Sequence, residues 1–247
     1  MNRRYRIVVV GGGVTGLMIA TLLAKGRHSE ALDITLVDAA SRPSYDSDGD
    51  VALRVSAIAR GTAELFDSVA AWDFVAATRA SPYESMCVWD ESDAPDSASS
   101  LRFDAAEFAV PQLGFIVENA LLQESLLRQL DATDAELRFG KRIGSLCRKA
   151  RQFHIELEDS EVLAADLLVG ADGARSFVRS AAGIDTSEWP YEQTAFVTHL
   201  QPEMPHNATA WQRFLRTGPL GMLPLEDGRV SVVWSTTPEQ AKAALSA

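Results

Sequence analysis

Apolar positions near the N-terminus follow a strand pattern, then a helix pattern, then a strand pattern again. Residues 6–10 form a β-branched run that ends at glycines, which is typical of a buried parallel strand. Residues 14–25 place apolar side chains at helical spacing, and we expect Gly26 to end this helix. Residues 33–38 have the composition of a second strand. This order predicts a βαβ unit with a right-handed crossover.

The middle of the chain mixes helix and strand patterns. Residues 56–69 have helical spacing, residues 84–90 alternate like a strand, and the polar stretch 91–100 is typical of an exposed loop. Residues 119–130 carry leucines at helical spacing, and the apolar run 167–171 leads into an Asp-Gly pair. Three shorter strands are expected at 136–139, 143–148 and 153–157.

From Thr194 onward the pattern changes to longer strand segments. Turns at 217–219 and 226–228 separate them, which predicts an antiparallel sheet packed as a second layer against the half that contains the βαβ unit. Thr237 and Pro238 are typical of the cap and first residue of a helix that is only beginning, so the chain is expected to be incomplete at its C-terminus. The predicted strands are 195–200, 210–215 and 230–235.

Composition narrows the class of protein. With 47% hydrophobic and 23% charged residues, the 247-residue chain is expected to fold as a soluble globular protein. A net charge of -11 disfavours nonspecific attraction to nucleic acid or to an anionic membrane. The N-terminal apolar run is too short for a signal peptide or a membrane span, which predicts a cytoplasmic protein. Cys87 and Cys147 are isolated, so we expect free thiols, and the scattered histidines predict no metal site.

The glycines after the first strand form the pattern Gly11-x-Gly13-x-x-Gly16. In a dinucleotide-binding βαβ unit the first glycine permits the tight turn, the second lets the backbone approach a pyrophosphate, and the third lets helix and strand pack closely. Asp38 ends the second strand, 22 residues after Gly16, where a carboxylate suits the two hydroxyls of a ribose. The alternative is a glycine-rich turn in another kind of α/β protein.

A second motif follows the apolar run at 167–171. Asp172 and Gly173 occupy a tight turn between a strand and the start of a helix, and Arg175 and Arg179 come directly after them. Taken alone, this pattern is equally typical of a structural βα turn, in which Asp-Gly is common. Taken together with the glycine fingerprint, it indicates a second contact with the dinucleotide.

With these motifs, the sequence resembles the class A flavoprotein monooxygenases related to para-hydroxybenzoate hydroxylase. Within them it is most similar to the branch that hydroxylates ubiquinone precursors (the UbiH/UbiF/VisC-type hydroxylases). The resemblance runs from Arg6 to Ala241, nearly the whole chain. Besides the two motifs, it is carried by residues 54–58, 114–119, 211–214 and 218–225.

This resemblance implies an α/β fold with α+β elements, in which a Rossmann-like FAD-binding domain is interleaved with an antiparallel-sheet substrate domain. The FAD-binding domain would comprise residues 1–80 and 113–190. The substrate domain would comprise residues 81–112 and 191–247 and would be incomplete at its C-terminal end.

The resemblance also assigns roles to single residues. Arg54 matches an arginine that contacts the phosphate region of FAD, although a solvated surface arginine is the alternative. Gln123 matches a flavin-contacting polar residue, although an exposed glutamine is nearly as well supported. Arg175 and Arg179 would serve FAD or NAD(P)H, or else be solvated. The other FAD-binding residues implied are Gly11, Gly13, Val14, Thr15, Gly16, Asp38, Asp172 and Gly173.

The implied reaction is hydroxylation of an aromatic ring. NAD(P)H would reduce FAD, and O2 would react through a flavin C4a-hydroperoxide with a polyprenylated phenol of ubiquinone biosynthesis. Because the flavin carries this chemistry, no catalytic side chain is assigned. A biosynthetic protein complex and peripheral membrane contact without a span are the partners implied. The residues expected on the sheet facing the flavin, or else in the sheet core, are Trp211, Phe214, Leu220, Met222 and Leu223.

One family motif has no counterpart in these 247 residues. The family carries a later Gly-Asp pair that holds the flavin, whereas the Gly-Asp pair of this chain, Gly49-Asp50, lies in another region. Two alternatives therefore stay open: a truncated or non-catalytic family member that acts as a binding partner in a biosynthetic complex, and another flavoenzyme of the same fold. The tryptophan-rich signature of flavin halogenases is absent, which disfavours a halogenase.

Overall fold

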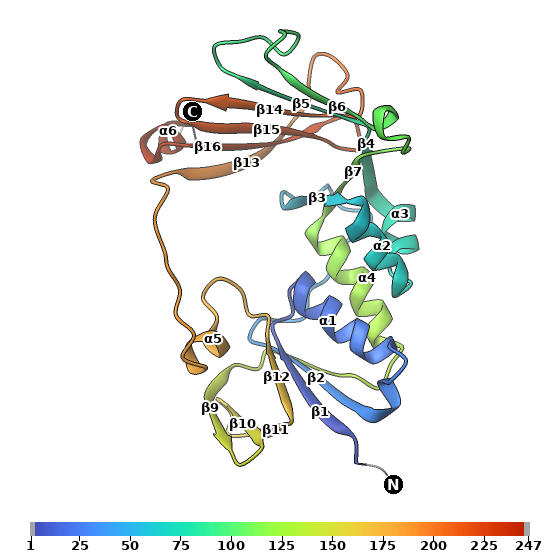
Figure 1. The fold of residues 1–247 in the computed structure, drawn as a ribbon, viewed down its shortest axis with the longest axis vertical. Helices are drawn as coiled ribbons and strands as arrows, with labels where there is room; N and C mark the ends of the chain where they lie inside the picture. The colour runs from blue at the N-terminus through green and yellow to red at the C-terminus, as the bar shows by residue number, and fades with distance from the viewer. Residues whose placement is uncertain (1–2, 245–247) are drawn as a thin grey trace. The chain divides into compact units, whose positions relative to one another are not determined.

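The computed structural model describes residues 3–244, which form two compact units (Figure 1). The chain passes between them several times, so each unit is built from separated segments. Unit 1 contains Met1–Asp46, Leu65–Phe74 and Ala120–Ser187, with its description starting at Arg3. Unit 2 contains Ser47–Glu64, Val75–Asn119 and Glu188–Ala247, with its description ending at Ala244.

Unit 1 is built on a four-stranded parallel sheet (Figure 1). Its strands are β1 (Tyr5–Val10), β2 (Leu32–Asp38), β8 (Glu136–Phe139) and β12 (Leu167–Gly170), in the order β12-β1-β2-β8. Helices α1 (Val14–Lys25) and α4 (Asn119–Asp131) lie beside each other, and the Lys25 Nζ donates a 2.6 Å hydrogen bond to the Gln129 Oε1. The short helix η1 (Ser29–Ala31) leads from α1 into β2.

The centre of the parallel sheet is buried, which explains why β1 carries an unbroken apolar run at residues 7–10. Val8, Val10 and Val37 pack against Ile155 and Leu157 of a second, antiparallel sheet. That sheet has the order β11-β10-β9, and the short helix α5 (Phe177–Ala181) adds Val178 to the same core. Its strands are β9 (Ile143–Lys149), β10 (Gln152–Leu157) and β11 (Val162–Ala165).

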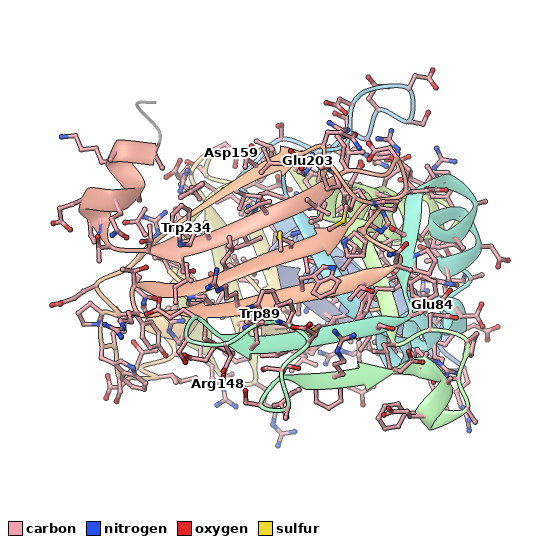
Figure 2. The ribbon with its side chains drawn as sticks, turned by 90° about the horizontal axis from the view of Figure 1, so that it is seen from above. Glu84, Trp89, Arg148, Asp159, Glu203 and Trp234 are labelled. Atoms are coloured by element: carbon pink, nitrogen blue, oxygen red, sulfur yellow. The ribbon has the colours of Figure 1, made fainter. Side chains whose placement is uncertain are left out.

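Unit 2 contains a six-stranded sheet, which Figure 2 shows face-on. The strand order is β13-β16-β15-β14-β5-β6, and all neighbours are antiparallel except the parallel pair β14 and β5. A smaller sheet has the order β3-β7-β4. The strands of the large sheet are β5 (Ser85–Asp90), β6 (Leu101–Asp104), β13 (Thr194–Leu200), β14 (Thr209–Leu215), β15 (Gly218–Pro224) and β16 (Val230–Thr236), and those of the small sheet are β3 (Val55–Ala59), β4 (Ala80–Tyr83) and β7 (Gly114–Glu118).

Four further helices complete the described chain. These are α2 (Arg60–Ser68), α3 (Trp72–Arg79), the short η2 (Ala105–Phe108) and α6 (Pro238–Ala244). Thr237 caps α6 as predicted, because its Oγ1 accepts a 3.3 Å hydrogen bond from the Gln240 N–H. Among the described residues, no helix combines the length and the apolar character that a membrane crossing requires.

The prediction of a single helix over residues 56–69 is wrong in its first turn. Residues 56–59 belong to β3, which pairs antiparallel with β7 in the register Ser56↔Val117. The helix begins only at Arg60. The predicted turn at 217–219 is also wrong in part, since Gly218 and Pro219 start β15. In both places a neighbouring strand supplies hydrogen bonds that helical spacing or turn residues cannot reveal.

The expectation that five side chains of β14 and β15 share one face is also wrong. Side chains alternate along a strand, and the register pairs Trp211 with Met222 and Arg213 with Leu220. Trp211, Leu220 and Met222 therefore share one face of the sheet. Phe214 and Leu223 point to the opposite face.

The core of unit 1 gives a test of this packing. Leu126 in α4 is completely buried, whereas Leu22 in α1 is 38% exposed. Leu126→Ala should lower the free energy of unfolding by about 3 kcal/mol, because a lost side chain leaves a cavity in a core. Leu22→Ala should cost less than about 1 kcal/mol. Urea unfolding of both variants measures this difference, and equal losses would contradict the placement of α4.

Candidate dinucleotide-binding site

A cavity of about 530 Å³ lies in unit 1 at the carboxyl ends of the parallel strands. Four strand ends contribute to it, since β1, β2, β8 and β12 all run in one direction. Ligands of open α/β sheets bind at this edge, and the volume lies in the range of small-molecule sites, roughly 300–1,000 Å³. Its lining includes Gly11, Gly13, Asp38, Ala39, Lys141, Arg142, Ile143, Asp172, Gly173, Arg175 and Phe177.

The three fingerprint glycines serve different purposes. Gly11 has a φ of +115°, and a Cβ placed on it would lie 2.2 Å from the Ala171 carbonyl oxygen. A Cβ on Gly16 would lie 1.9 Å from the Gly11 carbonyl oxygen. A Cβ on Gly13, in contrast, would have no protein atom within 4 Å among the described residues. Gly11 and Gly16 are thus required by packing, whereas Gly13 borders the open cavity.

The N-terminus of α1 begins at the cavity. Gly13 is its N-cap, and the first helical hydrogen bond runs from the Leu17 N–H to the Gly13 carbonyl at 3.0 Å. The N–H groups of Val14, Thr15 and Gly16 therefore have no partner within the helix. No side chain of the described residues 3–244 caps this end. Free N–H groups and the positive end of the helix dipole make it suitable for a phosphate.

Two side chains hold the peptide groups of Gly12. The Asp38 carboxylate accepts a hydrogen bond from the Gly12 N–H and a 2.6 Å bond from the Ala40 N–H. From α4, the Gln123 Nε2 donates a 2.9 Å hydrogen bond to the Gly12 carbonyl. Each carboxylate oxygen keeps a second lone pair, so Asp38 can still accept ribose hydroxyls. The loop is thus fixed from both sides.

Asp172 shapes the turn after β12. Its carboxylate accepts hydrogen bonds from the Ser176 hydroxyl and, at 3.1 Å, from the Val178 N–H. Ser176 in turn is the N-cap of α5 and accepts a 2.9 Å bond from the Arg179 N–H. Gly173 has a φ of +82°, a conformation that glycine adopts without strain. The Asp-Gly pair therefore directs the turn toward the cavity.

The structure brings most of the predicted site residues to one edge of the sheet. Gly11, Gly13, Asp38, Asp172 and Gly173 line the cavity. The remaining fingerprint residues start α1, and Gln123 contacts the loop. Gln123 is therefore not a freely exposed side chain, and its contact with the flavin stays a prediction.

The three predicted arginines have different surroundings in the structure. Arg175 lines the cavity, whereas the Arg179 Nη2 donates a 2.7 Å hydrogen bond to the Ala174 carbonyl and stabilises the turn. Arg54 belongs to unit 2, where it precedes β3 and is exposed. Its proposed contact with the cofactor stays a prediction.

Sequence reasoning missed the cations that follow β8. Lys141 and Arg142 line the cavity beside Ala39, and a hydrogen bond with Asp159 raises the pKa of Lys141, so it remains a cation. The available signal was the parallel-sheet rule, because the carboxyl end of every strand faces this edge. The position of β8 next to β2 could not be read from the sequence.

The open space at Gly13 allows the position of the phosphate to be tested by substitution. Gly13→Val should fold normally but lose FAD binding, because its side chain would fill the place of a phosphate. Gly61→Val is the matched control, since a Cβ at Gly61 also meets no atom within 4 Å among the described residues. Fluorescence titration with FAD measures both variants. Wild-type affinity in folded Gly13→Val would refute this placement of the phosphate.

The Gln123 contact gives a second prediction. Gln123→Leu removes one hydrogen bond from the Gly12 carbonyl and should weaken FAD binding by roughly fivefold, the equivalent of about 1 kcal/mol. Gln129→Leu on the same helix removes a bond to Lys25 instead and should leave the affinity within about twofold of wild type. If both variants weakened FAD binding equally, the effect would come from α4 as a whole and not from the loop.

Comparison with known proteins agrees with this geometry. The protein family described as FAD binding domain matches residues 4–245. The mitochondrial ubiquinone biosynthesis monooxygenase COQ6 of Xenopus tropicalis is 37% identical over 254 residues, which cover 98% of this chain and 53% of that protein. The 3-demethoxyubiquinol 3-hydroxylase of Escherichia coli K12 is 34% identical over 242 residues, which cover 98% of this chain and 60% of that enzyme. The chain thus spans about half to three fifths of their lengths.

Solved structures share the fold at lower identity. PqsL from Pseudomonas aeruginosa, in complex with 2-aminobenzoylacetate, superposes with a TM-score of 0.77 at 20% identity, covering 98% of this chain and 63% of that one. HpxO from Klebsiella pneumoniae, complexed with FAD and uric acid, gives a TM-score of 0.71 at 17% identity, covering 95% and 57%. The predicted fold class is confirmed, as is the resemblance to the class A flavoprotein monooxygenases. The chain belongs to the FAD binding domain family.

Proposed function

We propose that this chain binds FAD in the cavity of unit 1 and acts in an FAD-dependent monooxygenase that hydroxylates an aromatic ring. The observation that carries the proposal is the glycine loop at the start of α1, open to the cavity at Gly13 and held by Asp38 and Gln123. Membership of the FAD binding domain family identifies the dinucleotide. The reductant proposed is NADH or NADPH.

The residues present fit the dinucleotide part of FAD. The free N–H groups at the start of α1 and the open space at Gly13 accommodate a pyrophosphate. Lys141, Arg142 and Arg175 add positive charge to the lining of the same cavity. Asp38 supplies acceptors for ribose hydroxyls, and its negative charge disfavours a 2′-phosphate. The free helix N-terminus and these cations support a phosphate-containing ligand in this cavity.

FAD supplies the redox chemistry of such an enzyme, accepting a hydride from NAD(P)H and delivering an oxygen atom from O2 to the substrate. The part of this chain is to bind and orient the cofactor. The glycine loop holds the pyrophosphate, and the Asp172 turn closes the cavity edge opposite Asp38. Arg54 is proposed to contact the phosphate region, and Val14 and Thr15 to donate their backbone N–H groups. No side chain needs to act as a nucleophile.

The substrate class follows from the relatives. Two of them are named a ubiquinone biosynthesis monooxygenase and a 3-demethoxyubiquinol 3-hydroxylase. A polyprenylated phenol is therefore the proposed substrate, and the sheet face of unit 2 that carries Trp211, Leu220 and Met222 is proposed to contact its prenyl chain. A cytoplasmic location, peripheral membrane contact and a biosynthetic protein complex are proposed with it. The interleaved FAD-binding and substrate domains are proposed with the boundaries expected from the sequence.

The proposal is tested first by the absorbance of bound flavin and then by enzymatic turnover of a phenol. Purified protein supplied with FAD should absorb at about 450 nm, as bound flavin does. NAD(P)H oxidation should rise when a prenylated phenol is added, and mass spectrometry should find the phenol heavier by one oxygen atom. A halide should give no such stimulation. Protein that takes up no FAD would overturn the proposal and favour a non-catalytic binding partner.

A further inference from the structure

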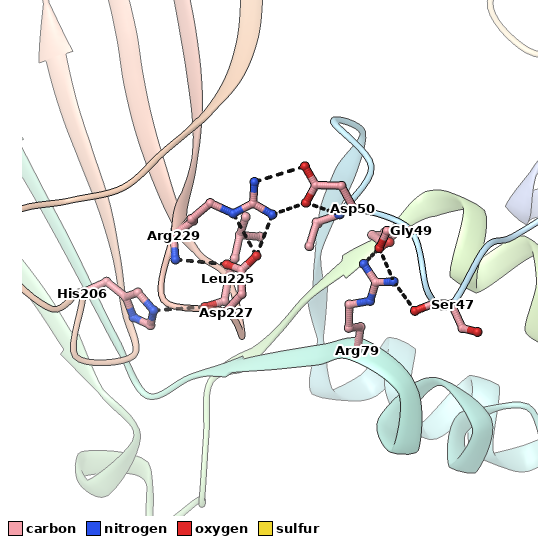
Figure 3. Close-up of polar contacts among 10 residues, drawn as sticks. Ser47, Gly49, Asp50, Arg79, His206, Leu225, Asp227 and Arg229 are labelled. Atoms are coloured by element: carbon pink, nitrogen blue, oxygen red, sulfur yellow. Dashed lines mark hydrogen bonds and ion pairs between the residues drawn. The ribbon is translucent and has the colours of Figure 1, made fainter.

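The loop between β2 and β3 is anchored in unit 2 by two arginines. Its segment 47–50 approaches Arg229, the residue before β16, on one side and Arg79, at the end of α3, on the other (Figure 3). Four residues beyond Asp50 the chain reaches Arg54, the cation proposed to contact FAD. The contacts that hold this loop therefore influence the position of Arg54.

Arg229 binds the loop through a carboxylate. Its guanidinium donates two hydrogen bonds to the Asp50 carboxylate, one of them from Nη1 at 3.3 Å. This contact holds the pKa of Asp50 below its usual range. Asp50 also accepts a 2.8 Å bond from the Val51 N–H, which shapes the loop as it leaves the contact. The charged pair is thus joined directly to the backbone that leads to Arg54.

Hydrogen bonds within its own turn orient the Arg229 side chain independently of the loop. Its Nε donates a 2.8 Å hydrogen bond to the Asp227 carboxylate, and its own N–H bonds to the other oxygen at 3.0 Å. The turn that carries both residues is closed by a 2.9 Å bond between the Leu225 N–H and the Arg229 carbonyl. The His206 ring lies 3.0 Å from the Leu225 carbonyl (Figure 3). Little side-chain entropy is left to lose when Asp50 binds.

Arg79 binds the loop through its backbone. Its guanidinium donates hydrogen bonds to the Ser47 carbonyl at 2.7 Å and to the Gly49 carbonyl at 3.1 Å. A third contact joins the Arg79 Nη1 to the Glu118 Oε2 at 3.5 Å, where the Glu118 side chain is only 3% exposed. A cavity of about 20 Å³, room for one water molecule, separates Val51 from this pair. The loop carbonyls are therefore held by an arginine that is itself paired with a buried carboxylate.

This arrangement differs from an ordinary surface ion pair, which contributes about 0–1 kcal/mol. Asp50 is 77% exposed, but Arg229 is 25% exposed and Arg79 only 18%. The two arginines are thus partly desolvated, whereas the Asp50 side chain is largely exposed. The far end of the segment is fixed as well, because the Arg54 carbonyl accepts a 3.0 Å bond from the Asn119 N–H.

We infer that Asp50, Arg229 and Arg79 form a clasp that fixes the loop 47–54 and thereby positions Arg54 for FAD. The three are positioning residues, since they act through Arg54. This inference rests on the proposed function. With the clasp closed, Arg54 is held ready for the cofactor; with the clasp open, FAD binding must first order the loop, and the affinity falls.

The test compares Asp50→Asn with wild type by two measurements. Hydrogen exchange of the amides in residues 46–54 should be roughly fivefold faster in Asp50→Asn, because the loop opens more often. FAD affinity, measured by fluorescence titration, should be roughly fivefold weaker, and Asp50→Glu, which keeps the charge, should recover most of it. In the double variant with Arg54→Gln, Asp50→Asn should add little further loss, since the residue that it positions is gone.

Asp33→Asn is the matched control, because Asp33 forms an exposed ion pair with Arg4 in unit 1, outside this loop. It should change neither the loop exchange nor the affinity. Wild-type chain that fails to bind FAD would overturn the proposed function and the clasp's role with it. Wild-type binding combined with unchanged exchange and affinity in Asp50→Asn would overturn the clasp alone. Independent, additive losses from Asp50→Asn and Arg54→Gln would also overturn it.

Discussion

The close approach of three backbone segments at the end of β1 is the constraint on which the site depends. The Gly11 N–H bonds to the Val37 carbonyl at 2.8 Å, and the Ala171 N–H bonds to the Val10 carbonyl at 2.7 Å. A Cβ on Gly11 or Gly16 would lie within about 2 Å of a carbonyl oxygen, far inside any permitted contact. The turn after β1 can be this tight only with glycine. That tightness places the start of α1, Asp38 and the Asp172 turn around one cavity.

Once the turn is fixed, the polar groups around it divide into those that shape the site and those that remain available. Asp172, Ser176 and Arg179 use their hydrogen bonds on the turn after β12. Gln123 uses its amide on the Gly12 carbonyl. The N–H groups at the start of α1 and the second lone pairs of Asp38 remain for a ligand. A site built this way is ordered before the ligand arrives, which lowers the entropy cost of binding.

Local signals made the first half of unit 1 predictable. The strand 6–10, the helix 14–25 and the glycine spacing each depend on neighbouring residues, and β1, α1 and the fingerprint follow them closely. The errors arose where a distant strand decides the structure. Residues 56–59 have helical spacing but pair with β7, and β15 includes two glycines and two prolines yet lies between β14 and β16. Lys141 and Arg142 were missed for the same reason, since their place depends on β8 pairing with β2.

The most direct test of the central claim is hydrogen exchange of the whole chain with and without FAD. Bound FAD should slow the exchange of amides in the segments that surround the cavity: residues 11–16, 38–40, 141–143 and 172–175. The β9–β10 hairpin tip around residue 150 should exchange unchanged and serves as the internal reference. Protection confined to other segments, or no protection at saturating FAD, would contradict a dinucleotide site at the carboxyl ends of the unit 1 strands.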